Sequence, residues 1–324
     1  GASVEAGYPI FVLHMTAGVM GGLGLALMYL PAVDIIHKYF DRNLGLAVGI
    51  AMSGCAIGTM VMSPLVYQLN IKLGLGLTLL VLGGLSSLGV FFIGLFDTPP
   101  SSLGDEETEK PGLKVYRRIL GDPKVLLLLL SKTLVNMSVF TGFFFTADSE
   151  RQMDIEEQYI SIIYLTIGVF SFLGRIIFGK MLDMFREKSF ILTTVMLVLL
   201  TGVLGASIYM PGLTGQLICA GLFGFSYGSY VASYIVILQL VCKDTVRESF
   251  GLCLFVIALT SVVTPVIVGP VFDATGSYRL GYLVVAGLGL GGVLLFTLLI
   301  YLTTREQSGA IAAKCPQNYE QILD

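Results

Sequence analysis

The feature that most constrains this chain is a series of long apolar segments separated by short polar ones. A helix needs about 20 apolar residues to cross the hydrocarbon core of a bilayer. Turn and charge clusters divide the sequence into nine such segments, at about 8–37, 43–66, 74–96, 124–147, 158–182, 189–209, 213–241, 247–272 and 279–303. A membrane β-barrel would instead show alternating segments of about 10 residues. The chain is therefore predicted to be an all-α polytopic membrane protein with nine transmembrane helices.

Composition agrees with this prediction and excludes other classes. The 324 residues are 55% hydrophobic and 13% charged, whereas an average soluble domain carries about 25% charged residues. A net charge of −3 offers no basic stripe for nucleic acid. Five scattered cysteines form no CxxC pair and no metal-ligand spacing. We expect a lipid bilayer around the chain and neither a cofactor, a metal nor a nucleic-acid partner.

Lysine and arginine residues in the loops predict the orientation, because they accumulate on the cytoplasmic side. If nine spans alternate, one set of loops holds fourteen of these residues and the other set holds three. The set of fourteen includes the 97–123 loop and the C-terminus. We therefore expect both to be cytoplasmic, in a protein of the plasma membrane.

The longest polar break divides the chain into a three-helix part and a six-helix part. We predict a remnant of an N-terminal bundle at 1–96, a central cytoplasmic loop at 97–123, a C-terminal six-helix bundle at 124–304 and a cytoplasmic tail at 305–324. This arrangement looks like a transporter of six plus six helices without its first three. A natural nine-helix protein is the alternative.

One stretch carries a family resemblance. Residues 21–58 read GGLGLALMYLPAVDIIHKYFDRNLGLAVGIAMSGCAIG. This closely resembles the monocarboxylate transporter family (solute carrier family 16 type) of the major facilitator superfamily, in which a GGLGLA helix precedes a Tyr-Phe-basic loop and a small-residue helix. Matching positions include Tyr39, Phe40, Arg42, Gly49 and Gly54. The family usually has two or more basic residues in a row after Tyr-Phe, whereas this chain has Asp41-Arg42-Asn43.

The resemblance continues along the chain. Residues 168–188, GVFSFLGRIIFGKMLDMFREK, are similar to the family's eighth helix and the loop after it. Residues 264–282, TPVIVGPVFDATGSYRLGY, are similar to its last helix junction. The resemblance covers about residues 8–303 and implies a major facilitator fold lacking its first three helices, with the equivalents of helices 4–12.

Two basic residues lie inside predicted spans, where a charge costs on the order of 2.5–3.5 kcal/mol. Lys132 and Arg175 each lie about seven residues from a cytoplasmic helix end, roughly 10 Å deep. No Asp or Glu lies at a comparable depth in the nine spans. Two unpaired cations favour an anionic guest, and arginine offers a fork for a carboxylate. The alternatives are an Arg175 that bonds backbone carbonyls and a Lys132 that extends to the interface.

The resemblance implies roles for other positions. In proton-coupled members an aspartate stands where this chain has Ser171, and a serine does not titrate near neutral pH, so we expect weak proton dependence. Tyr227 occupies the position of a substrate-facing aromatic residue, and packing between helices is its alternative role. Val231 stands where lactate carriers have a serine, which suggests a bulkier or less polar guest. Further candidates for the cavity wall are Asn136, Ser226, Ser229 and Ser233.

Other residues are predicted to control conformation or packing. Asp183, Arg186 and Lys188 are expected to form a cytoplasmic charge latch, with a solvated loop as the alternative, and Asp273 is expected to brace the outer helix junction. The acidic segment 148–157 is expected to be a solvated surface. Close helix packing is predicted at four pairs of small residues. They are Gly18/Gly22, Gly45/Gly49, Gly54/Gly58 and Gly224/Gly228.

These observations predict a transporter that moves a monocarboxylate or a related small organic solute by alternating access. Proton-coupled symport is one form of that function, and facilitative transport of a non-carboxylate solute is another. A non-transporting, sensing membrane protein of the same fold is the alternative from a different class. An enzyme is not expected, because no catalytic carboxylate, histidine or thiol is apparent at depth. Because some members of the family work with a single-span accessory membrane protein, the resemblance also implies such a partner.

Overall fold

The structure is a computed structural model that describes residues 14–24, 26, 27, 29, 44–87, 113–210, 212–242 and 245–320. All regular elements in this part of the chain are helical. They are a π-helix (His14–Met20), α4 (Leu44–Ser87), α6 (Leu113–Gly121), α7 (Pro123–Phe144), α8 (Thr146–Gln152), α9 (Glu157–Met184), a 3₁₀ turn (Arg186–Lys188), α10 (Ser189–Ser207), α11 (Gly212–Val241), α12 (Val246–Thr275) and α13 (Tyr278–Glu320).

Seven helices in the described residues are long and apolar enough to cross a membrane. The first of them, Gly45–Ser87 within α4, is interrupted at Gly74, whose φ of 73° and ψ of 172° are not helical. Glycine adopts this positive φ without a steric penalty. Gly74 is the first residue of the predicted span 74–96, so the span 43–66 and the described part of the span 74–96 are the two limbs of α4. The predicted span 8–37 lies mostly outside the described residues.

The other six membrane-crossing helices correspond to the six predicted spans from residue 124 onward. Local sequence sets several of their ends. The Asp122 side chain accepts a hydrogen bond of 2.9 Å from the backbone N–H of Lys124, and Pro123 occupies the first turn of α7, where no N–H is needed. Gly276 ends α12 with a left-handed φ of 65°. The all-α polytopic membrane fold is confirmed.

The packing of α9 relies on glycines. A Cβ at Gly45 would lie 2.7 Å from the Gly179 carbonyl oxygen, so α4 and α9 are in backbone contact. On its other side, α9 packs against α11, where Gly224 and Gly228 face the backbone of Ile167 and Ser171. The predicted close packing at Gly45/Gly49 and Gly224/Gly228 is confirmed. At Gly54/Gly58 and Gly18/Gly22 no atom of another described element lies within 4 Å of an added Cβ, so close packing there stays a prediction.

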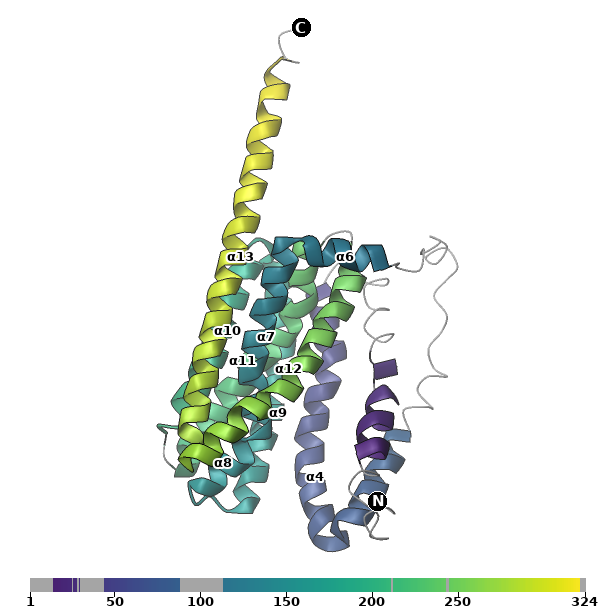
Figure 1. The fold of residues 1–324 in the computed structure, drawn as a ribbon, viewed down its shortest axis with the longest axis vertical. Helices are drawn as coiled ribbons and strands as arrows, with labels where there is room; N and C mark the ends of the chain where they lie inside the picture. Colours follow the sequence, from purple (N-terminus) through teal and green to yellow (C-terminus); the bar gives the residue numbers. More distant parts are fainter. Residues whose placement is uncertain are drawn as a thin grey trace.

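Serines join α7 to α13. Ser131 Oγ donates a 2.7 Å hydrogen bond to the Gly292 carbonyl, and Ser138 Oγ donates one of 3.1 Å to the Val285 carbonyl. Small polar residues of this kind stabilise helix contacts in lipid, where apolar side chains gain little from leaving it. They keep α7 against α13 on the side of the bundle away from α4 (Figure 1).

Figure 1 also shows how the ends of the bundle are arranged. The short helix α6 and the projecting part of α13 lie at one end, and α8 lies at the opposite end. We call these the α6 end and the α8 end. The predicted central loop 97–123 therefore includes a helix, and α13 runs past residue 304 to Glu320. The division of the chain at 96, 123 and 304 stays a prediction.

Candidate functional site

A cavity of about 200 Å³ lies among α4, α7, α9, α11 and α12. Most of its wall is apolar or aromatic, formed by Tyr29, Met52, Val139, Phe140, Tyr227, Tyr230, Val231, Tyr234, Ile235, Phe250, Leu254 and Ile257. Polar groups from three helices complete the wall, namely Cys55, Asn136 and Arg175. A mostly apolar cleft with a few convergent polar groups is typical of a small-molecule site.

Arg175 is the charged residue of this wall. It lies on α9 and is only 2% exposed. Its Nη1 donates a hydrogen bond to the Met52 carbonyl of α4, whereas its buried Nε has no partner among the described residues. Among the described residues no carboxylate lies within ion-pair distance of its guanidinium. One nitrogen therefore bonds a backbone carbonyl, as the structural alternative predicted, and the positive charge remains without a counter-charge in the described part.

Tyr227 lies beside this charge. Its ring centroid is 5.6 Å from the Arg175 guanidinium carbon, and its ring meets that of Phe143 edge to face at 5.0 Å. It lines the cavity, which is the location expected of a substrate-facing residue, and it also packs between helices, which was the alternative. Tyr230 and Tyr234, which were not predicted from the sequence, lie on the same face of α11. Their spacing from Tyr227, three and seven residues, is the helical signal that could have found them.

Lys132 lies behind this tyrosine wall and does not line the cavity. Its Nζ is 4.1 Å from the ring centroid of Tyr230 and 4.0 Å from that of Tyr234, and it has no hydrogen-bond partner. At 2% exposure the residue does not reach the interface, so the extended alternative is wrong. Asn136, one turn along α7, does line the cavity. Its Nδ2 donates hydrogen bonds to the Tyr230 hydroxyl at 2.9 Å and to the Lys132 carbonyl at 2.8 Å.

The candidate serines lie away from the cavity wall. Ser171 is 2% exposed, its Oγ has no partner, and its backbone packs against Gly228 of α11. Ser226, Ser229 and Ser233 each donate to a carbonyl of their own helix. The three predicted wall serines Ser226, Ser229 and Ser233 therefore do not line this cavity, and neither does Ser171. Helix periodicity alone does not tell which face of a buried helix meets a cavity.

Asp183 makes a different contact from the predicted charge latch. Its two carboxylate oxygens accept hydrogen bonds from the backbone N–H groups of Gly45 and Leu46, at 2.9 and 2.8 Å. It thereby caps the N-terminus of α4 from the end of α9. Arg186 and Lys188 are exposed, and neither is within ion-pair distance of Asp183 in the described part.

The remaining predicted residues have no shared site. Asp273 is exposed near the end of α12. Gly49 packs against the backbone of Arg175, and Gly54 has no close neighbour in the described part. Tyr39, Phe40 and Arg42 lie outside the described residues. Roles in gating for Asp183, Arg186, Lys188 and Asp273 stay predictions.

The acidic segment 148–157 is only partly a solvated surface. Arg151 forms exposed ion pairs with Asp148 and Glu157, both at 2.6 Å. Glu150, however, is 4% exposed and points into a second, smaller cavity. The expectation of a solvated loop is wrong for Glu150, because α8 turns that side chain inward.

Comparison with known proteins places this geometry in a family. The family model of the Major Facilitator Superfamily matches residues 2–265. The chain is 29% identical over 301 residues to Monocarboxylate transporter 12 of Xenopus laevis, covering 84% of this chain and 65% of that protein. It is 26% identical over 291 residues to Monocarboxylate transporter 10 of Rattus norvegicus, covering 83% of this chain and 55% of that protein.

The chain belongs to the Major Facilitator Superfamily, and its predicted resemblance to monocarboxylate transporters is confirmed. It spans between 55% and 65% of the length of these two curated relatives.

Proposed function

We propose that the protein transports a small organic anion, of the monocarboxylate class, by alternating access through the cavity beside Arg175. The observation that carries this proposal is the guanidinium on the cavity wall with no carboxylate partner among the described residues. A carboxylate on the solute supplies the missing negative charge, and the planar guanidinium can hold it with two hydrogen bonds.

The rest of the wall favours a solute with an apolar body. Tyr227, Phe140 and Phe250 present ring surfaces, and Val231 adds an aliphatic one. The volume of about 200 Å³ far exceeds the roughly 10–15 Å³ that one water needs. These features support an organic acid larger and less polar than the smallest hydroxy acids.

Two contacts between α4 and α9 support alternating access. Asp183 caps α4 at the α6 end, and the glycine contact at Gly45 and Gly179 lets the two backbones lie close together. Rocking of one bundle against another around a central site is the general mechanism of transporters with such repeats. We propose that breaking the Asp183 cap accompanies opening at this end.

The environment of Ser171 bears on whether transport is coupled to protons. The residue is buried next to Arg175 on α9 and does not titrate near neutral pH, so we propose facilitated transport with weak dependence on a proton gradient.

We further propose a plasma-membrane location, with the α6 end cytoplasmic, and a single-span accessory partner. Measuring the amount of this protein at the cell surface, with and without a co-expressed single-span membrane protein, tests the proposed partner.

Uptake of radiolabelled monocarboxylates into cells that express the protein tests the proposed function. Arg175→Ala is expected to abolish uptake while the amount of protein at the cell surface stays normal. Arg279→Ala is the matched control, because it removes an exposed arginine that does not line the cavity. Unchanged uptake in Arg175→Ala would contradict the role of Arg175, and no uptake by the unaltered protein would contradict transport of this class.

A further inference from the structure

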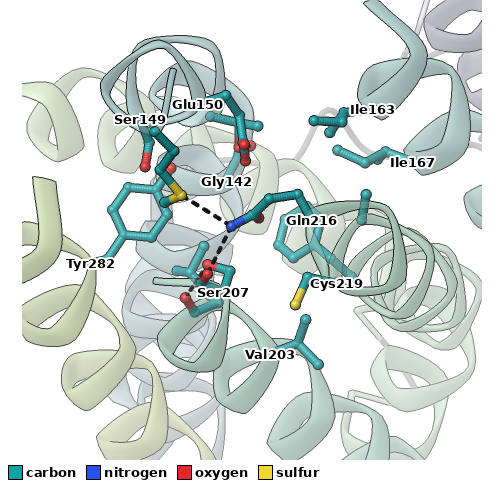
Figure 2. Close-up of a pocket in the computed structure, with 15 residues that line it drawn as sticks. Gly142, Ser149, Glu150, Ile163, Ile167, Val203, Ser207, Gln216, Cys219 and Tyr282 are labelled. Atoms are coloured by element: carbon teal, nitrogen blue, oxygen red, sulfur yellow. Dashed lines mark hydrogen bonds between the residues drawn. The ribbon is translucent and has the colours of Figure 1, made fainter. Parts of the chain in front are cut away.

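A second cavity lies at the α8 end of the bundle, away from the site beside Arg175. Its volume is about 40 Å³, enough for one or two waters. Its wall is formed by residues of α7, α8, α9, α10, α11 and α13, and Figure 2 shows Glu150, Gln216 and Tyr282 arranged around it. Residues that line the candidate substrate cavity do not occur in its wall.

Glu150 enters this cavity, and its Oε2 has no hydrogen-bond partner among the described residues. The residue is 4% exposed, and that oxygen is buried. An ionised carboxylate in such a place loses its hydration without compensation, which costs several kcal/mol. A protonated carboxyl group avoids most of that cost, because it is neutral and its hydroxyl can donate to a water in the cavity.

The groups that face Glu150 from the surrounding helices give it no positive charge. The titratable ones are Tyr164 on α9, Cys219 on α11 and Tyr282 on α13, all neutral when protonated. The Tyr282 hydroxyl also lacks a hydrogen-bond partner. On α8 itself, Arg151 is turned outward and is paired with Asp148 and Glu157.

The cavity suits a proton better than a metal cation. Hard cations are bound by several oxygen ligands, as they are in Ca²⁺ sites. Na⁺ is a cation of this kind. Here much of the wall is carbon or sulfur, including Met153, Ile163, Val203 and Phe223. In addition, Thr146 Oγ1 already donates to the Gly142 carbonyl of α7, and Ser207 Oγ donates to the Leu204 carbonyl of its own helix.

We propose that Glu150 is a proton-binding site, separate from the substrate cavity, whose occupancy keeps the α8 end of the bundle closed. Protonated Glu150, which is neutral, fits this small cavity. When the proton leaves to bulk water, the carboxylate must draw water in, and α8 moves away from α11 and α13.

The bonds around the cavity show what such a movement breaks. Gln216 of α11 donates to the Met153 sulfur just after α8, at 3.3 Å, and to the carbonyl of Ser207, the last residue of α10, at 2.9 Å (Figure 2). It also donates to the Met210 carbonyl just after α10, at 2.9 Å. The Glu150 carbonyl accepts from the Met153 and Ile155 N–H groups and so forms the turn into α9. A shift of α8 therefore reaches three helices. Burial raises the pKa of Glu150 to about 7, which puts the change within the physiological range.

This inference rests on the proposed transport function for its consequence, but proton binding can be measured without transport. Infrared difference spectra of the purified protein between about pH 5 and about pH 9 report the C=O stretch of a protonated carboxyl group. Glu150→Gln is nearly isosteric and cannot ionise. Glu157→Gln is the matched control, because it neutralises an exposed glutamate a few residues away.

A carboxylic-acid band that titrates near neutral pH in the unaltered protein and in Glu157→Gln, but is missing in Glu150→Gln, supports the proposal. A band that persists in Glu150→Gln, or no band at all, overturns it. Replacing choline by Na⁺ at constant pH leaves the band in place if the site binds protons. Loss of the band in Na⁺ assigns the site to that cation and overturns the proposal.

Transport supplies the second measurement. With equal pH on both sides of the membrane, the uptake rate is expected to change up to about tenfold between pH 6 and pH 8, following the protonated fraction of one group. In Glu150→Gln the rate is expected to be nearly independent of pH. An equal pH dependence in both proteins overturns the link to opening. If neither protein transports the tested anions, the proposed function fails while the infrared result still decides whether Glu150 binds a proton.

Discussion

At the scale of single residues, the candidate site is one charge set in an aromatic wall. Arg175 provides the charge, and Tyr227 covers part of the guanidinium with its ring. Neither residue is held by an ion pair in the described part of the chain. The site is therefore arranged to gain more from binding an anion than a site whose arginine is already neutralised.

Truncation of Tyr227 separates the effect of its ring from that of its hydroxyl. Tyr227→Phe keeps the edge-to-face contact with Phe143 and is expected to leave the KM for uptake within about twofold. Tyr227→Ala removes a contact worth about 0.5–1.5 kcal/mol and is expected to raise KM by up to about tenfold. Concentration-dependent uptake measures both. Equal KM values for all three proteins would show that Tyr227 only packs between helices.

Replacement of Lys132 is predicted to change the stability of the protein and its anion uptake in opposite directions. Its ammonium gains about 2 kcal/mol from the two tyrosine rings. Burial of a charge without a hydrogen bond costs several kcal/mol, which is the larger effect. Lys132→Met is therefore expected to stabilise the protein by about 1 kcal/mol or more while weakening anion uptake.

Thermal unfolding in detergent and uptake in cells check the two parts separately. Lys124→Met at the end of the same helix is the control for loss of a lysine outside the apolar interior. A clear loss of stability in Lys132→Met would mean that the ring contacts outweigh the cost of burial.

At the scale of helices, the close packing of α9 against α11 depends on glycines, which have no side chain. A methyl group at Gly228 would overlap the Ser171 backbone. Gly228→Ala is expected to destabilise the protein by about 1–3 kcal/mol through overpacking. This effect is larger than the gain of about 0.5–1 kcal/mol that alanine brings to a helix interior.

Gly202→Ala on α10 is the matched control for Gly228→Ala at the contact between α9 and α11. That glycine is exposed and has no other atom within 4 Å of an added Cβ, so its replacement is expected to be neutral or stabilising. Unfolding midpoints of the two variants measure the difference. A Gly228→Ala variant as stable as Gly202→Ala would show that α9 and α11 can separate without cost.

Much of the helical architecture could be predicted from the sequence, because apolar length and charge are local properties. The six spans after residue 124 and the position of Arg175 needed no information about packing. Two spans were predicted around Gly74, and the structure has a helix on each side of this non-helical residue.

The rest depends on how each helix is rotated about its axis, which neighbours distant in sequence decide. Depth along the helix placed Lys132 level with Arg175, but rotation placed it behind Tyr230 and Tyr234. Ser171 faces α11 for the same reason. Glu150 was missed because its neighbours Asp148 and Arg151 are polar and exposed, which makes the whole segment look solvated.

At the scale of the whole molecule, the pKa of Glu150 predicts a pH dependence of stability. Burial raises this pKa from 4.5 to about 7, so the folded protein binds the proton more tightly than the unfolded chain does. The stability that this difference gives is fully present below about pH 4.5 and is lost as the pH rises through about 7. The total is roughly 3 kcal/mol.

Thermal unfolding at about pH 5 and about pH 8 measures this loss, with Glu150→Gln as the comparison. The unaltered protein is expected to be less stable at the higher pH, and the variant is expected to change less by roughly the same 3 kcal/mol. Identical pH profiles would mean that Glu150 is not buried in the folded protein.

The central claim for the molecule is that Arg175 recognises the carboxylate of the solute. It is tested most directly by comparing uptake of a radiolabelled monocarboxylate with uptake of its neutral amide, in the unaltered protein and in Arg175→Ala. The unaltered protein is expected to prefer the carboxylate by at least about tenfold, because a charged hydrogen-bonded pair is worth about 1.5–3 kcal/mol. Arg175→Ala is expected to lose that preference. A preference for the carboxylate that survives in Arg175→Ala at full strength would contradict the claim.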